Sequence, residues 1–119
     1  MKITVIKEFS FDAAHILEGD QGGCGRMHGH TWKGEIHCQG SENELEHGIL
    51  VDFRKIKEQV KKLDHCFLND VLAAMGCEEP VYRRPTAEHL AMLLLKAIPR
   101  CVKVILYESP ENRVEVTHV

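Results

Sequence analysis

Three histidines in the first third of the chain have the spacing of a metal site. His28 and His30 are separated only by Gly29, and His15 lies upstream of them. Successive side chains of a β-strand point to opposite faces, so in an extended segment the two imidazoles of the pair lie on the same side. A catalytic zinc ion is typically held by three protein ligands, with one position left for water or substrate. We therefore expect one Zn²⁺, bound by His15, His28 and His30.

Cys24 lies just before the histidine pair, in the glycine-rich turn Gly22–Gly25. A thiol beside a cation is easily ionised, so Cys24 is a candidate for a fourth zinc ligand, a nucleophile or a base. The chain has no second Cys-x-x-Cys or His-x-x-x-His pair, and this excludes a zinc finger. The pattern favours an open, catalytic metal site.

Length and composition narrow the class of protein. A chain of 119 residues predicts one domain, residues 1–119, with a high ratio of surface to volume. A net charge of −3 and a pI near 6.2 give no basic surface for nucleic acid. No apolar run approaches the roughly 20 residues of a membrane span, and no signal sequence precedes the first strand pattern. We expect a cytoplasmic protein with reduced cysteines and no membrane or nucleic-acid partner.

The first half of the chain predicts two strands and a helix that carry these residues. Apolar and polar side chains alternate over Ile3–Phe11, which places His15 just past a strand end, and again over Thr31–Cys38. Apolar residues recur at helical spacing over Phe53–Leu63, and Asp52 is suited to cap that helix. The two strands should pair antiparallel, with the long loop between them carrying Cys24.

The second half predicts a helix and two more strands. Two prolines make residues 78–85 a predicted loop, after which Thr86 caps a helix that ends before Pro99. Residues 102–108 and 113–119 form a predicted hairpin. The order β-β-α-α-β-β predicts an α+β fold with a four-stranded antiparallel sheet and both helices on one face. The outer strands of such a sheet are open edges, so we expect a homo-oligomer.

Two further groups have both a structural and a functional interpretation. Asp64 and His65 follow the first predicted helix, where a cationic imidazole is favoured by the helix dipole. That dipole effect is worth only roughly 0.3 to 1 kcal/mol at an exposed site, too little to decide the role of the pair. Thr86 and Glu88 are ordinary residues for a helix start, as a cap and a first-turn acid. The residues alone leave both interpretations open.

Taken together, the motifs resemble those of the 6-pyruvoyltetrahydropterin synthase family, and most closely its 6-carboxytetrahydropterin synthase branch. The resemblance covers essentially the whole chain. It is carried by Phe11–His15, Cys24–His30, Leu63–His65, Pro85–Glu88 and Tyr107–Glu108. It implies the tunnelling fold (T-fold), in which three subunits join their sheets into a barrel and two trimers stack into a homohexamer with active sites between subunits.

The resemblance also implies roles for individual residues. His15, His28 and His30 match the zinc ligands, and Cys24, Asp64 and His65 match a proton-transfer set. Glu108 matches the residue that anchors the pterin, and Thr86 and Glu88 match positions that line the pterin pocket. Ala87 departs from the pattern, because some pyruvoyl-type members have a second threonine there.

The implied reaction converts 7,8-dihydroneopterin triphosphate and water to 6-carboxytetrahydropterin, acetaldehyde and triphosphate, a step toward queuosine and related deazapurines. The short spacing between Cys24 and His28 resembles the carboxytetrahydropterin branch, since the pyruvoyl branch has a longer insert there. Gly25 stands where a related folate-pathway variant carries glutamate. Two alternatives remain: the pyruvoyltetrahydropterin reaction, which keeps the carbon side chain, and a non-catalytic zinc- or pterin-binding protein.

Overall fold

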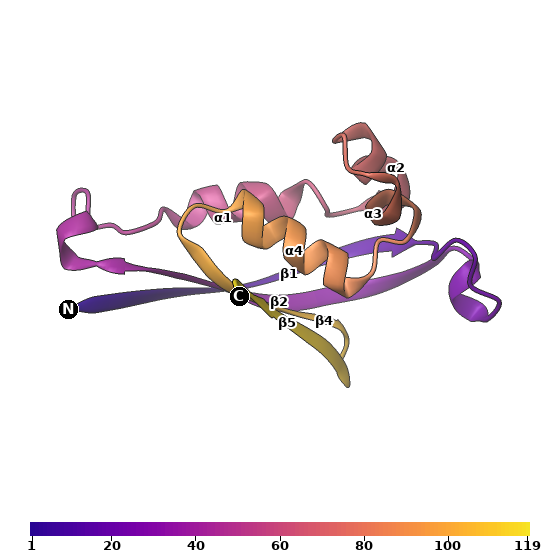
Figure 1. Ribbon diagram of the computed structural model, residues 1–119, viewed down its shortest axis with the longest axis horizontal. Helices are drawn as coiled ribbons and strands as arrows, with labels where there is room; N and C mark the ends of the chain where they lie inside the picture. The colour runs from indigo at the N-terminus through magenta and orange to yellow at the C-terminus, as the bar shows by residue number, and fades with distance from the viewer.

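The computed structural model describes all residues 1–119 and consists of one twisted sheet with its helices on one face (Figure 1). Strand β1 (Lys2–His15) pairs antiparallel with β2 (His28–Ser41) over their whole length, from Lys2 opposite Ser41 to His15 opposite His28. Strands β4 (Cys101–Ser109) and β5 (Asn112–Thr117) form the second hairpin, and β4 lies antiparallel to β2. The predicted α+β class is confirmed.

The sheet has five strands rather than the four that were predicted. A two-residue strand, β3 (Cys66–Phe67), runs parallel to β1 beside Ala13 and Ala14, which gives the order β3-β1-β2-β4-β5. So short a strand leaves no alternation in the sequence by which it can be recognised. It nevertheless fixes the turn before it against the end of β1.

Four helices, not two, cover one face of the sheet: α1 (Phe53–Lys61), α2 (Leu68–Ala74), α3 (Glu79–Arg83) and α4 (Ala87–Ala97) (Figure 1). The prediction of a loop over residues 78–85 was wrong. Proline lacks an amide hydrogen, but the first turn of a helix needs none, so Pro80 fits the start of α3. None of these helices has both the length and the apolar character needed to cross a bilayer.

Local signals explain where the two longest helices begin. The Asp52 carboxylate accepts a hydrogen bond from the Arg54 amide (2.9 Å) at the start of α1, and Thr86 Oγ1 accepts one from the His89 amide (3.2 Å) at the start of α4. Both caps satisfy amides that have no partner within the helix, as the sequence predicted. Helix α4 stops one residue before Ile98-Pro99.

The core lies between the helices and alternate residues of the sheet. On β1 the side chains that face the helices become buried toward the end that holds His15, where Phe11 and His15 are at most 2% exposed. On β2 the buried residues run from Trp32 to Cys38. The rings of Phe11 and Trp32 stack 5.8 Å apart. Helices α2 and α3 lie over this same end of β1 (Figure 1). The histidines are therefore built on two paired strands with a packed layer beneath them.

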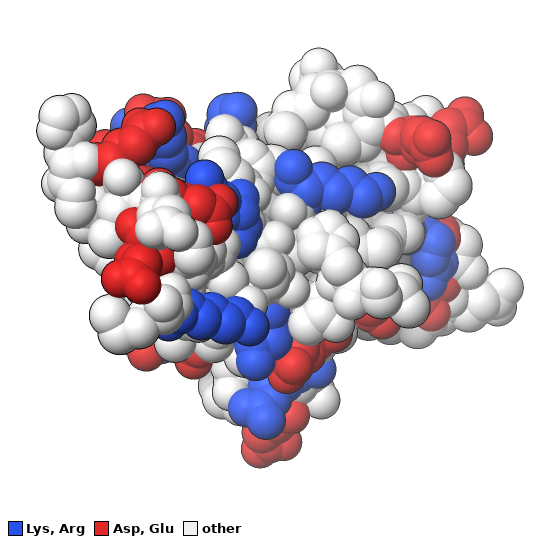
Figure 2. Space-filling model, turned by 60° about the vertical axis from the view of Figure 1, so that its left-hand side comes forward, with Lys and Arg blue, Asp and Glu red and all other residues white.

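Charged side chains of both signs are mixed on the surface. Figure 2 shows lysine and arginine interspersed with aspartate and glutamate on the face that it displays. This distribution agrees with the scattered basic residues of the sequence and with its small net charge of −3. On this face no extended basic stripe is available for a polyanion.

Candidate active site

The three predicted zinc ligands converge at the end of the β1–β2 hairpin. His15 is the last residue of β1 and lies opposite His28, the first residue of β2, while His30 lies opposite Ala13. The ring centroids are 4.5 Å apart for His15 and His28, 5.3 Å for His15 and His30, and 4.9 Å for His28 and His30. Candidate ligand atoms of these three residues and of Glu108 all lie within 4.8 Å of one another.

Hydrogen bonds to backbone carbonyls orient two of the rings. His15 Nδ1 lies 2.8 Å from the Pro85 carbonyl oxygen, and His28 Nδ1 lies 2.7 Å from that of Arg26. A carbonyl oxygen only accepts hydrogen bonds, so each Nδ1 must carry the proton and each Nε2 keeps its lone pair. Metal-binding histidines are usually oriented in this way, by donating their other ring N–H to a backbone carbonyl or a carboxylate.

The free nitrogens are suited to a cation. The Nε2 atoms of His15 and His30 are buried and have no hydrogen-bond partner. Burial lowers the pKa of His15, so that its ring stays neutral, which is the form that binds a metal. Buried polar atoms without partners are rare in native proteins, and a bound ion is one explanation for them. The residues present therefore fit a metal ion.

Glu108 and Trp32 complete the surroundings of the histidines. Glu108 Oε1 lies 3.1 Å from His30 Nε2 and 3.7 Å from His15 Nε2. The buried Trp32 ring meets those of His15 and His30 nearly at right angles, at 5.2 and 5.4 Å, and its Nε1 donates to the Ala13 carbonyl (3.3 Å). Sequence reasoning placed Trp32 on a strand without a role. Its signal was its position two residues after His30, on the same face of the strand.

Cys24 lies on the turn next to this cluster, but its immediate partner is an acid. It occupies the middle of a single 3₁₀ turn, Gly23–Gly25, and its carbonyl accepts from the Leu17 amide (2.9 Å). Loss of solvation and a hydrogen bond with the Asp20 side chain raise the pKa of the thiol, and the nearby Glu108 charge acts in the same direction. The sequence suggested that a cation beside Cys24 would make its thiol easy to ionise. Without that cation, the surrounding residues of the chain raise the thiol pKa instead.

Asp64 and His65 form a hydrogen-bonded pair beside β1. Asp64 Oδ2 lies 2.9 Å from His65 Nδ1, and the other oxygen, Oδ1, accepts from the Asp12 amide (2.9 Å). That backbone hydrogen bond is the main reason why the pKa of Asp64 is lowered. Helix α1 already ends at Lys61, and the His65 amide bonds to the Asp12 carbonyl (2.6 Å) instead of capping the helix. The geometry favours the paired imidazole over the helix-cap interpretation.

Two cavities flank His30 and connect these groups. One, of about 610 Å³, is lined by Asp12, His30 and His65 among others, and a second, of about 650 Å³, is lined by His30, Lys33 and Glu108 among others. Within one chain, the ionisable neighbours of Cys24 are Asp20, Glu108 and Arg84, and do not include Asp64 or His65. The structure thus brings the histidines and Glu108 together, and leaves the Asp64–His65 pair as a separate cluster.

Thr86 and Glu88 are placed as helix-start residues. The Thr86 hydroxyl caps α4, and Glu88 is an exposed residue of the first turn. Neither lines the two cavities beside His30. Their connection to the cluster is indirect, because the preceding residue, Pro85, supplies the carbonyl that orients His15.

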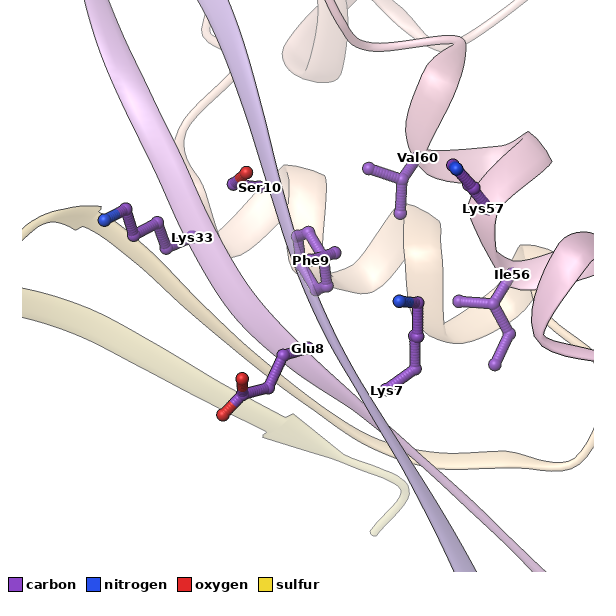
Figure 3. Close-up of a pocket in the computed structure, with 8 residues that line it drawn as sticks. All are labelled: Lys7, Glu8, Phe9, Ser10, Lys33, Ile56, Lys57 and Val60. Carbon is purple, nitrogen blue, oxygen red and sulfur yellow. The ribbon is translucent and has the colours of Figure 1, made fainter.

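A further cavity, of about 450 Å³, lies away from all predicted site residues, between β1 and α1 (Figure 3). Its apolar side chains are Phe9, Ile56 and Val60, with Lys7 and Lys57 beside them. Its polar lining also includes Glu8, Ser10 and Lys33, and no histidine or cysteine is among the lining residues.

Comparison with known proteins decides the family. The family model described as 6-pyruvoyl tetrahydropterin synthase matches residues 4–119. The chain belongs to this family. A solved structure of 6-pyruvoyl tetrahydropterin synthase from Caenorhabditis elegans has the same fold, with a TM-score of 0.74 at 19% identity over 100% of this chain and 97% of that one.

Curated relatives carry two different activities in their names. A 6-carboxy-5,6,7,8-tetrahydropterin synthase from Synechocystis is 32% identical over 88% of this chain and 85% of its own length. Another of that name, from Haemophilus influenzae, is 38% identical, and there the match spans 56% of this chain and only about half (52%) of the relative. A dihydroneopterin monophosphate aldolase from Pyrococcus furiosus is 32% identical over 98% of both chains. Family membership therefore leaves the reaction to be decided by the site.

Proposed function

We propose that this protein is a zinc-dependent 6-carboxytetrahydropterin synthase, which converts 7,8-dihydroneopterin triphosphate and water to 6-carboxytetrahydropterin, acetaldehyde and triphosphate. A pterin-synthase function is supported by the family and by the names of its relatives. The observation that carries the proposal is the convergence of three imidazoles next to the carboxylate of Glu108, with the Nε2 atoms of His15 and His30 buried and without a hydrogen-bond partner. The product would serve the biosynthesis of queuosine and related deazapurines.

Zinc is the metal that best suits this donor set. Imidazole nitrogens suit Zn²⁺, and three protein ligands leave a position for substrate. When bound, zinc supplies Lewis-acid chemistry that stabilises negative charge on substrate oxygens. In the zinc-loaded protein, His28→Ala should abolish stoichiometric metal, as measured by elemental analysis, whereas His118→Ala, at the exposed C-terminus, should retain it. Full zinc content in His28→Ala would refute the ligand assignment.

Cys24, Asp64 and His65 are proposed to move protons on the substrate side chain. Asp64 holds the Nδ1 side of His65, so the Nε2 of that ring is directed toward other groups, and the ring is 79% exposed. Positioned acid–base groups typically contribute roughly 10² to 10⁴-fold to rate. Because Cys24 and His65 do not meet within one chain, the proposal places the complete set between subunits of a homohexamer.

Glu108 is proposed to bind the pterin ring. Its carboxylate is 32% exposed at the end of β4, beside the cavity of about 650 Å³. A carboxylate accepts two parallel hydrogen bonds from the N–H groups of a 2-aminopyrimidinone edge. Thr86 and Glu88 are retained as proposed lining of the pterin pocket, which in this fold requires a neighbouring subunit or a movement at the start of α4.

The Cys24 turn disfavours the folate-pathway variant of the family. A Cβ atom placed on Gly25 would lie 2.3 Å from the Asp20 carbonyl oxygen, far inside contact distance. A glutamate at this position, as in the folate-pathway variant, requires the turn to change shape. The turn observed here is specific to glycine, and it sets the position of Cys24.

Product identification tests the proposal. Zinc-loaded protein is incubated with 7,8-dihydroneopterin triphosphate, and the products are identified by mass. Acetaldehyde together with 6-carboxytetrahydropterin is the expected result. Release of triphosphate without acetaldehyde would instead support the pyruvoyltetrahydropterin reaction, and side-chain cleavage of dihydroneopterin monophosphate would support an aldolase. Binding of zinc and pterin without any turnover would support the alternative of a non-catalytic zinc- or pterin-binding protein.

A further inference from the structure

Asp12 is the residue on which the Asp64–His65 pair is anchored. Its amide donates to Asp64 Oδ1 (2.9 Å), and its carbonyl accepts from the His65 amide (2.6 Å). These two backbone contacts come just before the point where β3 joins β1, at Ala13 opposite Cys66. They hold His65 in a left-handed conformation, with φ of 53°, which residues other than glycine rarely adopt. The turn is therefore held in this shape by β1.

The side chain of Asp12 faces the same pair. One ligand atom each of Asp12, Asp64 and His65 lies within 4.8 Å of the other two, so the Asp12 carboxylate borders the imidazole. Its orientation is fixed from the neighbouring strand, because Thr31, directly opposite on β2, donates from Oγ1 to Asp12 Oδ1 (2.6 Å). A charged acceptor makes this a strong hydrogen bond even at an exposed position.

Thr31 is also the residue after His30. Two sets of contacts therefore link the metal-ligand strand to the acid–base pair. The Thr31 hydroxyl holds the Asp12 carboxylate beside the imidazole, and the Asp12 backbone amide holds the Asp64 carboxylate that bonds to His65. Asp12, His30, Thr31 and His65 all line the cavity of about 610 Å³. The hydrogen bond between Thr31 and Asp12 joins two residues that line this cavity. It can therefore set the position of the His65 imidazole relative to the histidine cluster.

We propose that the carboxylate of Asp12, oriented by Thr31, is a positioning group that fixes the His65 imidazole together with Asp64. The inference rests on the proposed function only in assigning His65 to proton transfer, since the contacts themselves are independent of the reaction. Catalytic groups lose efficiency when the residues that support them are removed, and a displacement of about 1 Å can cost roughly 100-fold in rate. The Thr31 hydrogen bond is a single support, so we expect a smaller loss.

The test uses full-length, zinc-loaded protein and four variants: Thr31→Val, Asp12→Ala, the double variant, and Thr31→Ser. Both mutated side chains are exposed, and the backbone contacts of Asp12 remain in every variant. We expect kcat to fall about 10-fold in Thr31→Val and in Asp12→Ala with KM nearly unchanged. The double variant should be no worse than Asp12→Ala, because Thr31 acts through Asp12, and Thr31→Ser should restore the rate. Thr4→Val, on the same sheet face of β1, is the matched control and should behave as wild type.

A second readout does not depend on turnover. Side-chain ¹⁵N spectra of the histidines, with His65 assigned from His65→Gln, should show the Nδ1-protonated form of His65 in wild type. The His65 signals should shift in Thr31→Val and in Asp12→Ala, because the Asp12 carboxylate is then displaced from the ring or removed. Unchanged His65 signals in both variants overturn the inference, whatever happens to the rate. If the wild-type protein does not convert the pterin triphosphate, the proposed function fails, and the spectra alone decide whether Asp12 positions His65.

Discussion

At the scale of single residues, Glu108 has two candidate roles. Its carboxylate lies beside the histidine cluster, and it is also proposed to bind the pterin. Glu108→Gln keeps the size of the side chain but replaces one acceptor oxygen with a donor and removes the charge. We expect pterin affinity to weaken by roughly 2 to 4 kcal/mol, because buried donors of the ligand lose a charged acceptor. Titration with a non-reactive pterin measures the loss.

The zinc content of Glu108→Gln distinguishes a metal-binding role of Glu108 from a pterin-binding role. If Glu108 binds only the pterin, elemental analysis should find one zinc per chain, as in wild type. Cys24→Ala is the contrasting variant, which should keep pterin affinity and lose turnover. If Glu108→Gln loses zinc, and pterin binding falls only in proportion to the zinc that is lost, Glu108 is a metal ligand instead.

After loss of solvation, Asp20 is the main cause of the raised pKa of the Cys24 thiol. The hydrogen bond with Asp20 raises the thiol pKa above its ordinary value of 9.0, so less thiolate is present at any given pH. Asp20→Asn removes the charge and should lower that pKa, and a fall of one unit means about tenfold more thiolate below the pKa. We expect alkylation of Cys24 by iodoacetamide at pH 8 to become roughly 3- to 10-fold faster.

Site-resolved mass spectrometry measures this rate, with the partly buried Cys66 as an internal control, because Asp20 is not among the causes of its raised pKa. The effect should be incomplete, since loss of solvation is the largest cause of the shift and remains in the variant. An unchanged rate for Cys24 would mean that Asp20 does not set its ionisation.

At the scale of elements, the start of α4 serves both the helix and the histidines. Thr86 caps the helix through the His89 amide, and the carbonyl just before it orients His15. Thr86→Ala should lower the free energy of unfolding by about 1 kcal/mol, the usual cost of losing an N-cap, and Thr86→Ser should cost much less. Urea unfolding of the zinc-free proteins measures both. A loss of pterin affinity that Thr86→Ser restores would show that the hydroxyl also contacts the substrate.

Elements with strong periodic patterns or caps could be predicted from the sequence, and elements fixed by tertiary contacts could not. Alternation along β1 and the capping residues Asp52 and Thr86 are local signals, and the structure bears them out. Strand β3 depends on its pairing with β1, and α3 on a proline that is tolerated only at a helix start. The prediction of a loop over residues 78–85 failed because these few residues are placed by their neighbours.

In the candidate site, too, features set by local sequence could be predicted and features set by tertiary contacts could not. The convergence of His28 and His30 follows from strand geometry alone, and pairing with the preceding strand adds His15. The partners of those rings were not predictable, because the Pro85 carbonyl comes from 70 residues beyond His15. Asp12 was missed for a similar reason: its importance depends on the register that places it opposite Thr31 and beside Asp64.

At the scale of the whole molecule, the sheet has open edges and one uncovered face. From Lys2 to Phe11 the only strand beside β1 is β2, and β5 pairs only with β4. The cavity between β1 and α1 lies along this free edge (Figure 3). Unpaired strand edges are templates for another chain, and all four helices lie on the opposite side from the bare face (Figure 1). We therefore expect light scattering to report a trimer or hexamer rather than a monomer.

Shared sites in such an oligomer can be tested by complementation. Within one chain Cys24 contacts Asp20, whereas His65 contacts Asp64, and no hydrogen bond joins the two groups. If an active site takes Cys24 from one subunit and His65 from the next, then Cys24→Ala and His65→Ala are each inactive alone. Oligomers that contain both should regain some intact sites, because one neighbour supplies the thiol and the other the imidazole. The two variants are mixed, dissociated in mild denaturant, reassembled and assayed. Each variant treated alone is the control, and a mixture that stays inactive although mass spectrometry shows mixed oligomers would place both groups in the same subunit's site.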